Sequence, residues 1–311
     1  MILDDALGGI LLGTFLSVML YGICTLQAVL YFTDKLDEPM FLKALVSVVW
    51  VLETVHTAFT IYNIYVMTVT NFGDLESPGL IFWSEPAYIL TGIVIMFAVH
   101  CFFTRRVWLV CGKPLIFTGI LVVMVIAHFV IGLVIGVAYK FRTWPEFRKH
   151  DISLIVVCGG LGSAAVADIL IAAALSLYLR RGRQDLHERF SGVLNQIIFF
   201  IVSTGTLTAL TSVGTVIAFA TDKYGGVFLG MATLQSKVYA NSLLANLNSR
   251  KKLRNKLTSS GSQVEFTTVQ PLSMDSHRYP PNGSNISRRA ETAQSGSSDT
   301  DVTSTKQEVF V

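Results

Sequence analysis

Seven long apolar stretches make up most of this chain, and they limit its fold more than any other feature. Each is long enough to cross a bilayer as a helix, which takes about 20 residues. Only helices and closed barrels satisfy their backbone groups in lipid, and these stretches are too long and too unalternating for barrel strands. We therefore expect an all-α polytopic membrane protein, a bundle of seven transmembrane helices. The expected spans are residues 6–32, 44–70, 85–104, 115–139, 152–179, 191–221 and 225–248.

The composition agrees with a lipid environment. Hydrophobic residues make up 52% of the 311 positions and charged residues only 14%, whereas an ordinary soluble domain has about 25% charged residues. A water-soluble fold of this length would lack the polar residues to cover its surface. Soluble, intrinsically disordered and disulfide-rich classes are therefore excluded for the chain as a whole.

The basic residues predict an orientation, because cytoplasmic loops are enriched in Lys and Arg. Arg105 and Arg106 follow the third stretch, Arg180 and Arg181 follow the fifth, and a dense basic run begins at Arg250. All of these positions are cytoplasmic if the N-terminus is outside and the C-terminus inside. The basic loop between the fourth and fifth stretches is the exception to this pattern. We expect an N-out, C-in protein of the plasma membrane rather than an internal membrane.

The last part of the chain, residues 250–311, differs from the rest. After the basic run it is rich in Ser and Thr and contains Pro280-Pro281, so it cannot bury enough apolar surface to fold alone. We expect a disordered cytoplasmic tail. Ser298 and Thr305 stand in acidic contexts typical of phosphorylation sites. A basic run directly after a span indicates contact with the membrane surface, not with nucleic acid.

Ionisable residues inside a span are costly and by default face the bundle interior. Glu53 and His56 lie on one face of the second stretch, and Lys237 and Asn241 lie on one face of the seventh. Glu53 and Lys237 each fall about 18 Å along their helix, close to the middle of the bilayer. We expect the two to pair there, with His56 and Asn241 taking the remaining hydrogen bonds. A ligand or proton site and a static pair that fixes helix register both remain open.

Two further polar residues, His100 and Asp168, fall in the inner half of the third and fifth stretches, where they would contact each other or the inner loops. His128 stands alone on the fourth stretch and is typical of a hydrogen-bonded core histidine. The chain has no Walker loop, GxSxG elbow or HExxH motif. We therefore expect no catalytic residue, no metal and no cofactor, and a protein that is not an enzyme.

Three fragments resemble a known family. They are LKALVSVVWVLETVHTAF at residues 42–59, TNFGD at 70–74 and LQSKVYANSLLANLNSR at 234–250. They are similar to a family of seven-span membrane proteins of mushroom-forming (basidiomycete) fungi, catalogued as domain of unknown function 6534. The resemblance covers about residues 11–250. It implies receptor-like topology with a variable Ser/Thr-rich tail, and it implies no activity, ligand or catalytic residue.

Three functions fit these observations. The first is a receptor-like sensor of a small molecule or lipid, signalling to a cytoplasmic partner through the inner loops and a phosphorylatable tail. The second is a proton-coupled transporter that uses Glu53 and His56 as titrating groups. The third is a structural membrane scaffold in which the buried charges only fix packing. Topology alone does not choose between them.

Overall fold

The computed structural model describes residues 2–33, 39–74, 77–112, 114–134, 143–182, 188–221 and 225–259. They all fall in the first of two compact units, Met1–Gln263. The second unit, Val264–Val311, lies outside the described residues, and so does most of the expected disordered tail.

The all-α prediction is confirmed for the described residues. Their only β pairing is an isolated bridge between Leu80 and Thr143. The long helices are α1 (Ile2–Thr33), α2 (Met40–Tyr65), α3 (Ser84–Val110), α4 (Leu115–Leu133), α7 (Gly160–Gly182), α8 (Glu188–Thr221) and α9 (Gly226–Ser259). The short elements are the π turns η1 (Val66–Thr70) and η4 (Ile155–Gly159), the 3₁₀ turn η2 (Ser77–Gly79), α5 (Trp144–Arg148) and α6 (Asp151–Leu154).

Six of the described helices are long and apolar enough to cross a membrane, and they identify a multi-pass membrane protein. They cover Leu7–Thr33, Met40–Thr70, Ser84–Val110, Leu115–Leu133, Val157–Arg180 and Ile201–Thr221. The seventh expected span folds as α9, a helix of similar length that is less apolar than these six.

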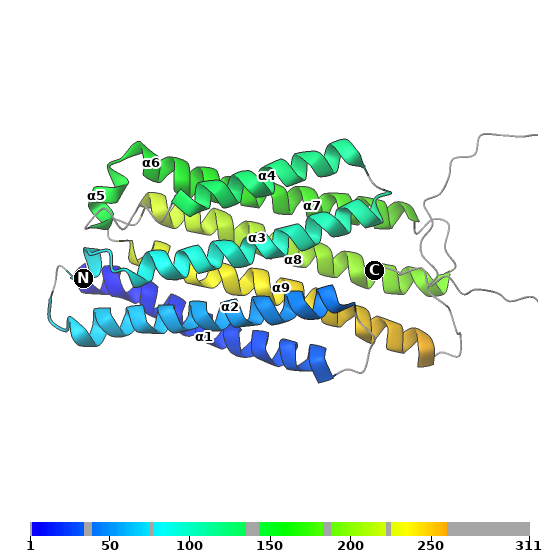
Figure 1. The fold of residues 1–311 in the computed structure, drawn as a ribbon, viewed down its shortest axis with the longest axis horizontal. Helices are drawn as coiled ribbons and strands as arrows, with labels where there is room; N and C mark the ends of the chain where they lie inside the picture. Colours follow the sequence, from blue (N-terminus) through cyan, green and yellow to red (C-terminus); the bar gives the residue numbers. More distant parts are fainter. Residues whose placement is uncertain are drawn as a thin grey trace, which may run out of the picture. The chain divides into compact units, whose positions relative to one another are not determined.

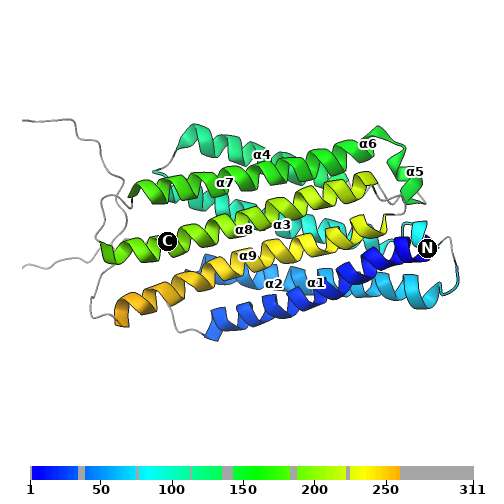
Figure 2. The same cartoon turned by 180° about the vertical axis from the view of Figure 1, so that it is seen from behind.

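The long helices lie side by side with alternating direction (Figures 1 and 2). Neighbours in the chain pack together from α1 through α4, α7 and α8 to α9, and α9 returns to pack along α1. Helix α3 also contacts α7 and α9 across the bundle. The N-terminus and α5 lie at one end of the bundle, called here the α5 end (Figure 1). This arrangement places α9 among α1, α2, α3 and α8.

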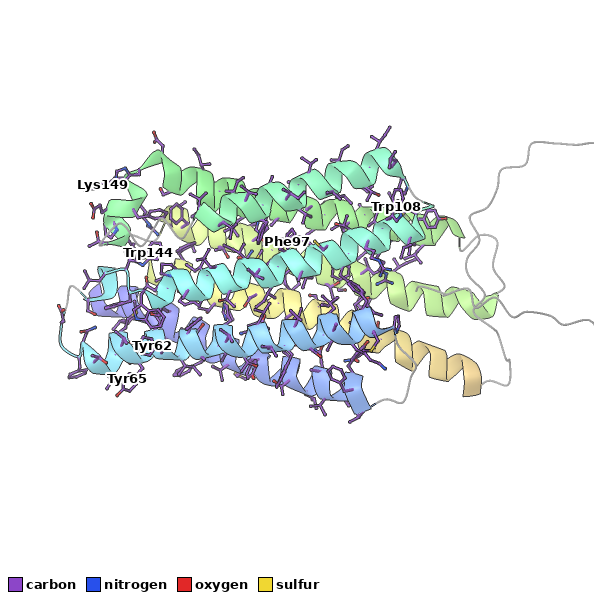
Figure 3. All side chains as sticks on the ribbon, in the orientation of Figure 1. Tyr62, Tyr65, Phe97, Trp108, Trp144 and Lys149 are labelled. Atoms are coloured by element: carbon purple, nitrogen blue, oxygen red, sulfur yellow. The ribbon has the colours of Figure 1, made fainter. Side chains whose placement is uncertain are left out.

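The bundle is apolar on its outside and partly polar on its inside. On α2, Val48, Val51 and Ile61 are exposed. Glu53 and His56 on the same helix are completely buried. Such a surface is stable in contact with lipid chains, which do not penalise exposed apolar side chains as water does. Aromatic side chains mark both ends, with Tyr62, Tyr65 and Trp144 towards the α5 end and Trp108 at the opposite end (Figure 3), as expected at membrane interfaces.

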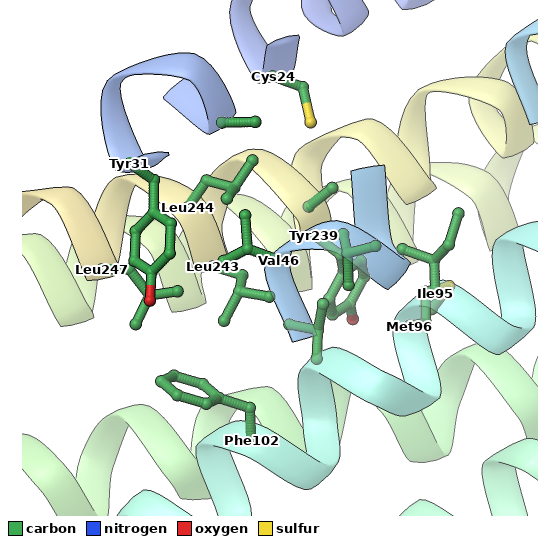
Figure 4. Packing of buried hydrophobic residues seen from close by; sticks show 14 of the residues in the cluster. Cys24, Tyr31, Val46, Ile95, Met96, Phe102, Tyr239, Leu243, Leu244 and Leu247 are labelled. Carbon is green, nitrogen blue, oxygen red and sulfur yellow. The ribbon is translucent and has the colours of Figure 1, made fainter. Parts of the chain in front are cut away.

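Two large clusters of apolar side chains fill the interior. The cluster away from the α5 end joins α1, α2, α3 and α9, and its labelled members include Tyr31, Val46, Phe102 and Leu243 (Figure 4). The cluster at the α5 end packs around Trp144. The two clusters fix the spacing of the helices on either side of the polar residues that lie between them.

Several boundaries differ from the sequence-based expectation. The expected end of the fourth span, Tyr139, lies outside the described residues, within the range 135–142, while α4 itself ends at Leu133. The sequence does not predict the short helix α5, because Trp144 and Phe147 fall in the expected loop between the fourth and fifth spans. In the structure both side chains are almost completely buried. Helix α9 continues past the expected start of the tail at 250 and ends at Ser259.

Helices α1 and α9 approach each other closely along glycines. A Cβ atom at Gly230 would lie 2.2 Å from the Gly9 carbonyl oxygen, and one at Gly13 would lie 2.4 Å from the Gly230 Cα. The spacing of Gly9 and Gly13 is the small-xxx-small pattern that lets helix backbones meet in lipid. The sequence has a second pair with this spacing, Gly132 and Gly136, in the expected fourth span. Of these, Gly132 packs against Ile93 and Gly136 lies outside the described residues.

Candidate functional site

The polar face of α2 meets α9 inside the bundle. Glu53, His56 and Thr57 occupy about one helical turn of α2, and Ser236 and Lys237 lie opposite them on α9. Each of the five side chains is at most 5% exposed. The three-to-four-residue spacing on α2 was visible in the sequence and places these residues on a single face. The site is therefore a buried polar contact between two helices.

Lys237 is the centre of this contact. Its Nζ atom forms an ion pair with Glu53 Oε2 and donates to Thr57 Oγ1 at 2.7 Å. It also lies 3.2 Å from the Glu53 carbonyl oxygen and 3.2 Å from His56 Nδ1. An isolated buried ammonium would be very costly, so this dense shell of acceptors is what allows Lys237 to stay inside the bundle. The structure thus brings together the two charges that the sequence placed at equal depth.

The contacts of His56 show which of its two ring nitrogens carries the hydrogen. An ammonium group only donates hydrogen bonds, so His56 Nδ1 accepts from Lys237 and its Nε2 carries the hydrogen. Nε2 lies 3.3 Å from Ser236 Oγ, which therefore accepts. His56 therefore connects the ion pair on one side to Ser236 on the other.

Asn241 has a different role from the expected one. It was expected to share the hydrogen bonds of the ion pair. Its Nδ2 instead donates to the Lys237 carbonyl at 2.8 Å and to the Leu20 carbonyl at 3.0 Å, and Gln27 Nε2 donates to its Oδ1 at 3.2 Å. Asn241 therefore ties α9 to α1, because its short side chain lies one turn beyond Lys237 and reaches the neighbouring backbone rather than the charges.

A second buried polar group lies deeper towards the end opposite α5. His100 Nε2 on α3 lies 3.1 Å from Asp168 Oδ1 on α7. The sequence predicts that His100 contacts either Asp168 or the inner loops, and the structure shows the contact with Asp168. Tyr239 on α9 donates to the other oxygen of Asp168. Tyr239 was missed, because a tyrosine in an apolar stretch gives no sequence signal of the carboxylate it meets.

Glu85, the first residue of the expected third span, forms a third buried polar group. It is completely buried. Trp144 Nε1 donates to its Oε2 at 2.8 Å, and Asn63 Nδ2 lies 3.5 Å from its Oε1. Ser84 donates to Asn63 at 2.7 Å. The α5 segment covers this carboxylate, and its return into the bundle could not be read from the local sequence.

A cavity of about 60 Å³ lies beside the ion-pair site, in the half of the bundle nearer α5. Its walls come from α3, α4, η4, α7, α8 and α9 and are mostly apolar. Ser236 belongs both to this wall and to the His56 contact. Within the described ranges, no group of three or more His, Cys, Asp or Glu side chains is placed to hold a metal ion.

Comparison with known proteins gives one match. Residues 164–252 match the model of a family described as "Family of unknown function (DUF6534)". The matched segment contains Asp168, Lys237 and the whole of the fragment at 234–250, whereas Glu53 and His56 lie outside it. No curated protein and no solved structure matches the chain.

Proposed function

We propose that this chain is a receptor-like membrane sensor with seven spans, of the fungal seven-span kind that its sequence resembles. In this proposal α9 is the seventh span. Its lower apolar content is accounted for by inward-facing polar residues, since Thr233, Gln235, Ser236 and Lys237 are all buried. Seven spans place the two ends on opposite sides, and the basic residues that follow the last span favour the cytoplasmic side for the C-terminal end of α9, with the N-terminus outside.

The observation that carries the proposal is that Ser236 belongs both to the cavity wall and to the ion-pair site. Its side chain lines the cavity and contacts His56, which in turn contacts Lys237. A molecule that occupied the cavity would press on α9 at the residue next to the ion pair. Occupancy would then bias the packing of α2 against α9, which run through the bundle to the cytoplasmic end. A ligand shifts such an equilibrium only through contacts that differ between the two states, and the Ser236–His56 contact provides one.

A cavity-filling substitution tests sensing without a known ligand. Ala232 lines the cavity, so Ala232→Leu imitates an occupied site. Spin labels at Met40 on α2 and Leu177 on α7, both exposed at the end opposite α5, would report movement of α2 as a change in their distance distribution in nanodiscs. We expect Ala232→Leu to shift that distribution and Val166→Leu, on the lipid-facing surface, to leave it unchanged. An unchanged distribution in Ala232→Leu would contradict sensing.

Proton-coupled transport is the second candidate. The observation in its favour is that Lys237 is in direct contact with two other proton-exchanging groups, Glu53 and His56. It predicts substrate-dependent acidification of vesicles that contain the protein and a trapped pH dye, and loss of that signal in Glu53→Gln. Sensing predicts no net proton movement in either form.

A further inference from the structure

The cavity beside Ser236 has an unusual wall. Three of its lining residues are glycines from three helices, Gly92, Gly132 and Gly160. Apolar side chains such as Ile93, Met96 and Phe228 form most of the remainder. Such a wall favours an apolar occupant, because displacement of water from apolar surface is favourable. Each glycine also lies against a neighbouring side chain, since a Cβ at Gly132 would lie 3.0 Å from Ile93 and one at Gly160 would lie 3.5 Å from Ile131.

One polar atom on this wall has no hydrogen-bond partner among the described residues. It is Nε2 of His128, a residue that is only 3% exposed. Nδ1 of the same ring lies 2.8 Å from the Gly160 carbonyl oxygen. A carbonyl oxygen only accepts, so Nδ1 carries the hydrogen and Nε2 of the neutral ring presents a lone pair. His128, a lining residue of the cavity, therefore has an acceptor nitrogen that lacks a donor among the described residues.

The other polar side chains on the wall are already used within the protein. Gln235 donates to Ser212 at 2.9 Å, Thr215 donates to the Thr211 carbonyl at 2.7 Å, and Ser236 contacts His56. A buried water typically makes about three hydrogen bonds, which this wall does not offer beside His128. A molecule with one donor and an apolar remainder matches it better, since an unsatisfied buried acceptor costs about 1–3 kcal/mol.

We propose that the cavity binds a compact apolar molecule with a single hydroxyl group, and that this hydroxyl donates its hydrogen bond to His128 Nε2. A cationic amine is excluded by the same wall, because none of its described lining residues carries a carboxylate and a buried unpaired charge is far more costly than a hydroxyl. The inference rests on the proposed function in taking this cavity as the occupied site. It adds to that function the chemical class of the ligand.

The test compares two probes of equal size, 2-methyl-1-propanol and 2-methylbutane, which differ by a hydroxyl in place of a methyl group. The full chain, labelled with ¹⁵N-histidine, is held in nanodiscs, and each probe is titrated to equal membrane concentration. We expect the His128 Nε2 resonance to indicate an unprotonated nitrogen in the free protein. It should then move saturably with the alcohol and not with the alkane. In ligand-observed spectra the alcohol should bind at least about fivefold more tightly than the alkane.

Three variants make the outcome decisive. Ala232→Leu should abolish the response by filling the cavity, and Val166→Leu, facing lipid, should keep it. His128→Phe should remove the preference for the alcohol while it keeps an aromatic ring at this position. A proton on Nε2 in the free protein, equal binding of the two probes, no binding of either, or an unchanged response in Ala232→Leu would overturn the proposal. The spin-label experiment tests sensing without any alcohol present. Its failure would therefore contradict sensing and leave alcohol binding intact, and a failure of alcohol binding would leave the spin-label result intact.

Discussion

At the scale of single residues, the Lys237 shell shows how one cation is kept inside an apolar bundle. The ammonium meets a carboxylate, a hydroxyl, a carbonyl oxygen and an imidazole nitrogen at once. Removal of one partner from such a pair leaves a charge without compensation. Removal of both leaves a neutral contact that repacking can tolerate.

The first prediction follows from this asymmetry. Glu53→Gln and Lys237→Gln should each lower the free energy of unfolding by about 3–5 kcal/mol, and the double variant should recover most of the loss. Reversible unfolding in mixed micelles, followed by tryptophan fluorescence, measures the three values. Single variants as stable as the wild type would show that the pair is not a structural requirement. A stable double variant with every phenotype intact would favour the structural-scaffold hypothesis over the sensing hypothesis.

Cys111 provides a prediction about pH. It follows the third span, its Sγ lies 3.9 Å from the Ala174 carbonyl oxygen, and burial raises the pKa of its thiol above the ordinary value. A raised pKa means less thiolate at pH 8, and the thiolate is the reactive form. In a chain with Cys24, Cys101 and Cys158 replaced by Ala, iodoacetamide should alkylate Cys111 more slowly than free cysteine. The rate should keep rising at pH values where that of free cysteine levels off. Equal rates for the two thiols at pH 8 would contradict the burial of Cys111.

At the scale of elements, the α1–α9 contact depends on the absence of side chains. The backbone of Gly9 occupies the space that a Cβ at Gly230 would need. The two helices are also joined by hydrogen bonds from Asn241 to Leu20 and from Asn248 to the Gln27 carbonyl. Any side chain at Gly230 must therefore separate helices that several other contacts hold together.

We expect Gly230→Ala to destabilise the protein by about 1–3 kcal/mol, the usual cost of overpacking. Gly22 is the matched control, because a Cβ there meets nothing within 4 Å. Gly22→Ala should be neutral or slightly stabilising, since Ala favours a helix over Gly. Thermal unfolding of both variants in nanodiscs measures the difference. If Gly230→Ala unfolds at the same temperature as Gly22→Ala, the close approach is not needed for stability.

The same scale shows where sequence reasoning succeeds. Apolar length placed the long helices, and polar spacing placed Glu53 and His56 on one face of α2, because both depend only on local periodicity. The Tyr239–Asp168 contact and the Trp144–Glu85 contact depend on which helices become neighbours. No local pattern contains that information. The role of Asn241 was misread for the same reason, since its partners lie on α1.

At the scale of the whole molecule, the number of spans decides where the two ends lie. Six spans would leave both ends on one side, and seven would separate them. Asp4→Cys and Ser259→Cys, each in a chain without other cysteines, would locate the ends of α1 and α9 with a non-permeant maleimide. We expect Asp4→Cys to be labelled on intact cells and Ser259→Cys only after permeabilisation. Labelling of both on intact cells would exclude the seven-span arrangement.

The polar interior of α9 also has a consequence for how the protein is made. A helix that carries Lys237, Gln235 and Asn246 inward has little tendency to enter lipid by itself, because central polar residues oppose insertion. Glu53 and the glycines of α1 are synthesised long before α9 leaves the ribosome. If α9 is the proposed seventh span, it enters the bilayer by joining helices that are already in place. Truncation of the early helices should leave this segment stranded in water, exposed to quality-control proteases.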